Sequence, residues 1–207
     1  MDAELHQETA LKAQTSEARP PCDRPRLPAI APPLLLPAPR RSTLDIGHPD
    51  SAEAIMVDII HRIGIKAPLS QVYAAVSTVN GISGWWSKET SGDSQLGGTF
   101  NVLFRNATGG EIGNMNFELA KLSRNEEVVW RCTSGPPEWL GTEVTFSLSQ
   151  QDDQTILIFG HRNWREAIEF TAHCSMKWAT FLLSLRKLAE TGKGEPSPND
   201  MKIDNWN

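Results

Sequence analysis

A chain of 207 residues fits one domain with an appendage more readily than two domains of ordinary size. Its net charge of −5 and the lack of a Lys/Arg cluster after residue 56 argue against a nucleic-acid or an anionic-membrane surface. The three cysteines, Cys22, Cys132 and Cys174, are too few and too scattered for a disulfide framework or a zinc site. Reduced thiols in the cytoplasm are therefore expected.

The first 55 residues differ in composition from the rest of the chain. They hold nine of the fourteen prolines and no aromatic residue, so they cannot bury enough apolar surface to offset the entropy of ordering. We expect residues 1–55 to form a disordered, proline-rich extension. Its apolar run, residues 27–38, contains four prolines and is shorter than the roughly 20 residues of a membrane span. The acidic start also differs from a secretory signal, so a cytoplasmic protein is expected, and Met56 is a candidate start.

The aromatic residues are confined to the second part of the chain, since all seven tryptophans, all seven phenylalanines and the one tyrosine lie after residue 72. From Val57 to Lys66, apolar residues recur at every second position, which predicts a half-buried strand. Pro68 suits a first helical turn, and residues 68–78 show helical spacing. A second short helix is predicted at residues 79–86.

Five further stretches alternate in the same way as the first strand. They predict strands, separated by turn-forming segments, at residues 100–105, 115–120, 128–133, 143–148 and 157–161. From Thr171 to Thr191, apolar residues recur at helical spacing and predict a long amphipathic helix of about 30 Å. Gly192 is placed to end this helix. Residues 193–207 are expected to form a mostly extended or mobile tail, from which Trp206 could pack back.

This order predicts an α+β protein. Because only the long helix is apolar enough to cover the buried face of the strands, we expect a curved, antiparallel, six-stranded sheet around it, with two short helices after the first strand. Residues 56–192 would form this domain.

Several segments in this order carry a resemblance to a known superfamily. The stretches GISGWWSKETSGDSQLGG, VWRCTSGPPEWLGTEVTFSLS, FGHRNW and HCSMKWATFLLSLRKLAETGKG resemble the SRPBCC superfamily, also called START-like or Bet v I-like. Within it, the chain is most similar to the bacterial branch related to activators of the heat-shock-protein-90 ATPase, over about residues 56–203. The resemblance implies a helix-grip fold, in which the curved sheet closes around the long helix and leaves a cavity.

Together with the strand alternation, the resemblance implies which side chains face that cavity. The implied ligand-binding residues are Trp85, Trp86, Phe104, Phe117, Trp130, Trp139, Phe159, His161, Trp164, His173, Cys174 and Trp178. The alternative for each tryptophan is an ordinary place in the core. Trp85 and Trp86 would point about 100° apart on a helix, so one of them is expected to line a cavity, a mouth or a partner surface.

The leading functional hypothesis is the binding of an apolar or aromatic small molecule in this cavity, with no catalytic residue, cofactor or metal. His161 and His173 could orient such a ligand or could simply make local hydrogen bonds. His173 and Cys174 point about 100° apart on a helix, and no HExxH or paired CxxC motif accompanies them, which argues against a nucleophilic dyad or a metal site.

Two other classes of function are left open by the sequence. One is a chaperone partner, although the eukaryotic heat-shock activators carry a separate folded amino-terminal domain that residues 1–55 are too short to supply. The other is a polyketide-cyclase-like enzyme, in which His161 could act with Glu143 or Glu166. Either a monomer or a homodimer is compatible with the sequence.

Overall fold

The computed structural model describes residues 57–106 and 108–206. The predicted disordered extension, residues 1–55, and the candidate start Met56 lie outside the described residues. The helices are α1 (Leu69–Ser77), α2 (Val79–Ser83) and α3 (Glu169–Thr191). The strands are β1 (Val57–Ile65), β2 (Glu89–Gly92), β3 (Thr99–Arg105), β4 (Glu111–Ser123), β5 (Glu127–Ser134), β6 (Glu143–Gln151) and β7 (Gln154–Trp164).

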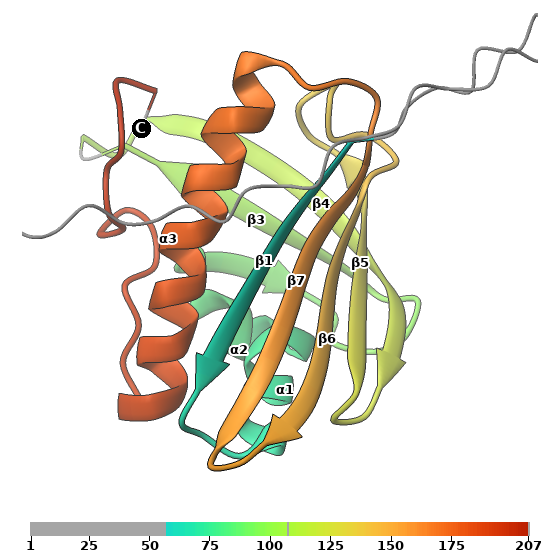
Figure 1. Ribbon diagram of the computed structural model, residues 1–207. Helices are drawn as coiled ribbons and strands as arrows, with labels where there is room; N and C mark the ends of the chain where they lie inside the picture. The colour runs from blue at the N-terminus through green and yellow to red at the C-terminus, as the bar shows by residue number, and fades with distance from the viewer. Residues whose placement is uncertain (1–56, 107, 207) are drawn as a thin grey trace, which may run out of the picture. The chain divides into compact units, whose positions relative to one another are not determined.

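In the described part of the chain, the strands form one seven-stranded sheet in the order β1-β7-β6-β5-β4-β3-β2, and every neighbouring pair is antiparallel. The sheet curves, α3 runs across its hollow side, and α1 and α2 close one end (Figure 1). This arrangement confirms the predicted α+β helix-grip fold. The sheet has one more strand than predicted, because the polar segment Glu89–Gly92 shows no apolar alternation and is ordered by pairing with β3.

The ends of the helices follow local chemistry. Gly192 has a φ of 79°, which favours glycine, and its N–H donates to the Leu188 carbonyl at 2.8 Å, so the predicted end of α3 is confirmed. The helix α2 stops at Ser83, three residues earlier than predicted. Trp85 and Trp86 therefore lie in the turn after the helix, and the angle of about 100° expected between helical neighbours does not hold for them. Their rings stack with centroids 6.1 Å apart.

The core beneath α3 is built from aromatic rings on the inward-facing positions of the strands. Trp130 lies at its centre, with its ring centroid 4.5 Å from Phe146 and 5.2 Å from Phe100. Its indole N–H donates to the Val76 carbonyl at 3.0 Å, and the Trp85 indole donates to the Ala75 carbonyl at 2.9 Å. These bonds fix the two indoles to the end of α1 and leave no unpaired donor on either ring.

The C-terminal tail returns along α3 and is held to the body of the protein (Figure 1). The Ser197 N–H donates to the Trp86 carbonyl at 2.9 Å, and the Lys88 N–H donates to the Ser197 carbonyl at 3.2 Å. The Ser184 hydroxyl also donates to the Trp85 carbonyl and accepts from the Glu195 N–H. The first half of the tail is thus fixed by backbone hydrogen bonds.

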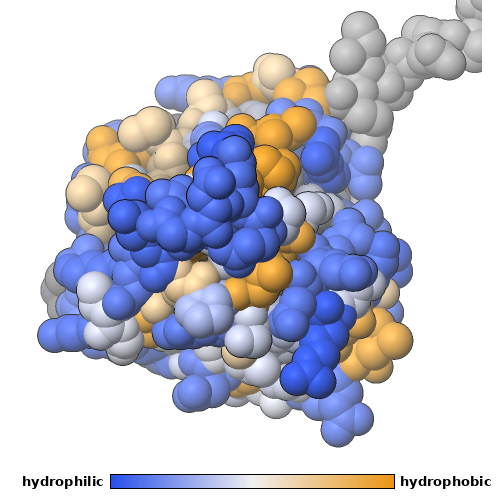
Figure 2. All heavy atoms as spheres, turned by 60° about the horizontal axis from the view of Figure 1, so that its bottom comes forward, coloured by the Kyte–Doolittle hydropathy of each residue, from blue (hydrophilic) through white to orange (hydrophobic). Residues whose placement is uncertain are grey.

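Apolar side chains are mixed with polar ones on the face that lies at the bottom of Figure 1. Figure 2 shows this face, where hydrophilic side chains predominate and hydrophobic ones lie scattered between them. Scattered apolar groups of this kind are normal for a protein surface. The cavity described next is therefore the better candidate for a binding site.

Candidate binding cavity

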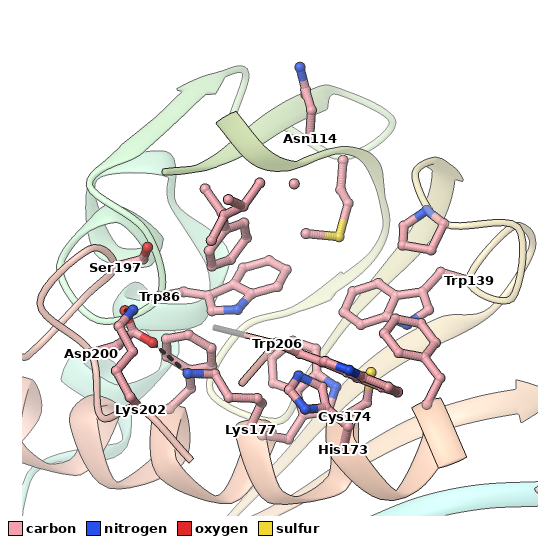
Figure 3. Close-up of a pocket in the computed structure, with 18 residues that line it drawn as sticks. Trp86, Asn114, Trp139, His173, Cys174, Lys177, Ser197, Asp200, Lys202 and Trp206 are labelled. Carbon is pink, nitrogen blue, oxygen red and sulfur yellow. Dashed lines mark hydrogen bonds and ion pairs between the residues drawn. The ribbon is translucent and has the colours of Figure 1, made fainter. Parts of the chain in front are cut away.

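A cavity of about 360 Å³ opens between the first half of α3, strands β3 and β4, the β5–β6 loop and the C-terminal tail (Figure 3). Its lining side chains are mainly aromatic and aliphatic, with a charged group at the tail side. The residues that line it are Trp86, Phe104, Ile112, Gly113, Asn114, Met115, Pro136, Trp139, Phe170, His173, Cys174, Lys177, Trp178, Phe181, Ser197, Asp200, Lys202 and Trp206.

Local sequence explains why these elements leave a space. On α3, residues 173, 174, 177, 178 and 181 fall on one helical face, and that face meets the cavity. The loop after β5 contains Pro136 and presents Trp139 as the opposite wall. On β4, Gly113 pairs with Phe104 and has no side chain, and a Cβ built there would lie 3.7 Å from the Phe104 Cβ. Gly113 thus leaves open a position that most residues would fill.

Charged groups of α3 and the tail meet on one side of the cavity. The Lys177 ammonium lies 2.5 Å from Asp200 Oδ2, donates to the Met201 carbonyl at 2.9 Å and sits 4.7 Å from the Phe181 ring centroid. The Lys202 ammonium approaches the other carboxylate oxygen of Asp200 at 3.1 Å. Burial alone would raise the pKa of Asp200, but hydrogen bonds and charge from the two lysines hold it below its usual range.

A second pair of groups lies one helical turn earlier, at the mouth. His173 Nδ1 lies 2.7 Å from Asp204 Oδ2, and this hydrogen bond lowers the pKa of the Asp204 carboxyl. The His173 ring stacks on Phe170 at 6.3 Å, and the Trp206 ring lies 5.1 Å from it. The end of the tail therefore packs back, and Figure 3 shows Trp206 beside His173 and Cys174.

The structure divides the twelve residues predicted to bind a ligand into two equal sets. The residues that line the cavity are Trp86, Phe104, Trp139, His173, Cys174 and Trp178. The others are all 0% or 1% exposed in the core below it and do not line it: Trp85, Phe117, Trp130, Phe159, His161 and Trp164. Trp139 and Trp164 are both buried, at 6% and 1% exposed.

His161 is part of a closed hydrogen-bond chain within the core. The Trp178 indole donates to His161 Nδ1 at 3.1 Å, so the ring proton lies on Nε2, which donates to the Thr142 hydroxyl at 2.8 Å. That hydroxyl donates in turn to the Trp139 carbonyl at 2.7 Å. Burial, offset in small part by Asp58, lowers the pKa of His161 to about 3. This neutral histidine positions Trp178 and Trp139, which are walls of the cavity.

Cys174 is a buried neutral thiol on the α3 face of the cavity. Burial raises its pKa to about 12, and it raises the pKa of Cys132 to about 11, so neither thiolate is populated near neutral pH. Within residues 57–106 and 108–206, no three His, Cys, Asp or Glu side chains are grouped so that they could hold a metal ion.

Sequence reasoning missed the charged side of the cavity. Lys177 could have been found, because it lies four residues after His173 and three after Cys174 on the same helical face. Asp200 and Lys202 carry no such signal, since the tail has no periodicity that would place it against α3.

The fold and the cavity define a helix-grip protein of the SRPBCC superfamily. Residues 66–190 match the model of the family described as activator of Hsp90 ATPase homolog 1-like protein, and the chain belongs to this family. A comparison with curated protein sequences found no match.

Solved structures resemble the chain over its folded part. The solution structure of the Aha1 dimer from Colwellia psychrerythraea is 41% identical in sequence, with a TM-score of 0.57, over 67% of this chain and 99% of that one. The protein SSP2350 from Staphylococcus saprophyticus is 16% identical, with a TM-score of 0.54, over 67% and 95% of the two chains. The protein CV1439 from Chromobacterium violaceum is 19% identical, with a TM-score of 0.54, over 65% of this chain and 98% of that one. The last two share the fold alone.

None of the helices in the described residues combines the length and the apolar character that crossing a membrane requires.

Proposed function

We propose that this protein binds an apolar or aromatic small molecule in the cavity between α3 and the sheet. The observation that carries the proposal is the cavity itself, about 360 Å³ in volume and walled by Trp86, Trp139 and Trp178. Ligand pockets typically begin at about 300 Å³ and are lined mostly by apolar and aromatic side chains with few polar groups. Indole walls offer a planar guest broad contact at low cost in side-chain entropy.

Binding of this kind requires no catalytic group. A guest of about 20 non-hydrogen atoms, each contributing roughly 0.3 kcal/mol, would gain about 6 kcal/mol and bind with a dissociation constant in the tens of micromolar. The enzyme alternative loses support because His161 lies outside the cavity and is held neutral by burial. A cytoplasmic location fits the free thiols of Cys132 and Cys174.

Filling the space beside Gly113 tests the proposal. Because Gly113 itself lines the cavity and a Cβ at this position meets only ordinary contacts, Gly113→Leu should occupy the cavity without unfolding the protein. The probe is N-phenyl-1-naphthylamine, a neutral aromatic dye whose fluorescence rises in apolar surroundings. We expect the wild-type protein to bind it and Gly113→Leu to bind it at least tenfold more weakly.

The matched control is Ser147→Leu. Ser147 is exposed on the outer face of β6, so this variant adds the same side chain away from the cavity. It should bind the dye as the wild type does. Equal binding by the wild type and Gly113→Leu would place the dye elsewhere and contradict the proposal.

A second candidate function is the regulation of a heat-shock-protein-90-type ATPase. It is favoured by the family match and by the 41% identity to the Colwellia Aha1. The test is the ATP hydrolysis rate of such a chaperone with and without this protein, and an unchanged rate would count against the candidate. Because that relative was solved as a dimer, sedimentation of this protein should accompany the assay.

A further inference from the structure

Two basic side chains of α3 are matched by two carboxylates of the tail. His173 and Lys177 lie one turn apart on the helical face that lines the cavity, and they meet Asp204 and Asp200 respectively. The charge of Lys177 also acts on Asp204. The mouth therefore contains a cationic site on α3, and the carboxylate of Asp204 occupies it.

The two carboxylates are held very differently. The Asp200 side chain is 5% exposed and is bonded by Lys177 and Lys202, so it is a fixed part of the wall. The Asp204 side chain is 38% exposed, and its Oδ2 lies 2.7 Å from His173 Nδ1. Its other oxygen accepts the N–H of Trp206, within its own turn. Asp204 is thus the carboxylate that can leave without stranding a buried charge.

An aromatic ring accompanies this carboxylate. Trp206 lines the cavity mouth, 5.1 Å from the His173 ring and 6.3 Å from the Phe170 ring, yet it is 48% exposed. A tryptophan seated in its own pocket would be almost fully covered, as Trp86 and Trp178 are at 2%. The end of the tail thus presents an acid and an aromatic ring to the mouth and is only partly buried there.

Charge at the cavity favours a negative guest. The lining residues include Lys177, Lys202 and Asp200, a net charge of +1 in a chain whose net charge is −5. A net positive charge around a cavity raises the local concentration of an anionic ligand. A guest that carried one acidic group could replace the carboxylate of Asp204 without leaving an unpaired charge.

We propose that the guest of this cavity is an aromatic monoanion, whose acidic group takes the place of the Asp204 carboxylate beside His173 and Lys177. Its ring system displaces the Trp206 indole and lies against Trp139 and Trp178. Residues Asp204–Trp206 then act as an internal competitor that covers the mouth when no guest is bound. This inference rests on the proposed small-molecule binding and names the chemical class of the ligand.

A pair of dyes that differ by one acidic group tests the inference. 8-Anilino-1-naphthalenesulfonate is N-phenyl-1-naphthylamine with a sulfonate, so the ratio of their dissociation constants reports the effect of the anion. Asp204→Asn removes the competing charge, and we expect it to tighten binding of the sulfonate dye about tenfold while the neutral dye changes less than twofold. The matched control, Asp153→Asn, removes an exposed carboxylate that pairs with Lys66, and it should change neither constant.

A second variant tests the displacement of the ring. Trp206→Ala removes the indole that covers the mouth, so both dyes should bind several-fold more tightly. Weaker binding of both dyes would make Trp206 a wall of the site and would overturn the displacement.

The possible outcomes separate this inference from the proposed function. If neither dye binds to the wild type or to Asp204→Asn, small-molecule binding itself fails, and this inference fails with it. If the neutral dye binds but Asp204→Asn leaves the ratio of the two constants unchanged, the anionic class is wrong while the proposed function stands.

Discussion

Replacement of Trp130 by alanine is expected to lower the free energy of unfolding by about 3–5 kcal/mol. The Trp130 side chain is 0% exposed and its ring lies within 6.3 Å of five other aromatic rings. Truncation would open a cavity at the centre of the core and leave the Val76 carbonyl without its indole donor. Urea denaturation at neutral pH measures the change.

The matched control for this variant is Trp206→Ala. The same side chain is removed, but Trp206 is 48% exposed, so the loss should stay below about 1 kcal/mol. A loss for Trp130→Ala as small as that for Trp206→Ala would show that the aromatic core is not close-packed as described.

The stability of the protein is expected to fall as the pH drops from 6.5 towards 3, because His161 is neutral in the folded state. Its pKa is about 3 when folded and 6.5 when unfolded, so below pH 6.5 the unfolded chain binds a proton that the folded chain does not. The stabilisation from this group is complete above pH 6.5 and is lost progressively as the pH falls. Between pH 7.5 and pH 4.5 the loss amounts to about 2–3 kcal/mol.

The variant His161→Gln isolates this contribution. Glutamine can accept from the Trp178 indole and donate to the Thr142 hydroxyl but does not titrate, so its stability should fall by about 2–3 kcal/mol less than the wild type over the same pH range. Denaturation curves of both proteins at several pH values measure the difference. Parallel curves for the two proteins would contradict a neutral, buried His161.

Most of the fold follows from two periodicities in the sequence. Alternation at positions such as Phe117 and Trp130 predicted strands, and the stripe that includes Trp178 and Leu185 predicted α3, because burial of one face dictates both patterns. The strand β2 and the early end of α2 carry no such pattern. Pairing with β3 orders β2, and the turn that brings Trp85 and Trp86 into the core ends α2.

The site was harder to predict, because a cavity is a space that the side chains of several elements leave unfilled, and no single pattern in the sequence encodes it. Phe104 and Phe117 both point inward from neighbouring strands, yet only Phe104 borders the empty space. Alternation predicts on which face of the sheet a side chain lies, but it does not predict how closely the neighbouring side chains pack around it. The space depends on Gly113, which lacks a side chain, and on the contact of Asp200 with Lys177 across 23 residues of sequence.

The proposed function requires above all that a guest enters between α3 and the sheet. The most direct measurement follows the tryptophan indole N–H signals by NMR while N-phenyl-1-naphthylamine is added. We expect saturable shifts for Trp86, Trp139 and Trp178, whose rings wall the cavity, and small shifts for the deeper Trp130. Saturation with no shift at the three cavity tryptophans would contradict the proposed function, and so would shifts confined to the exposed Trp206.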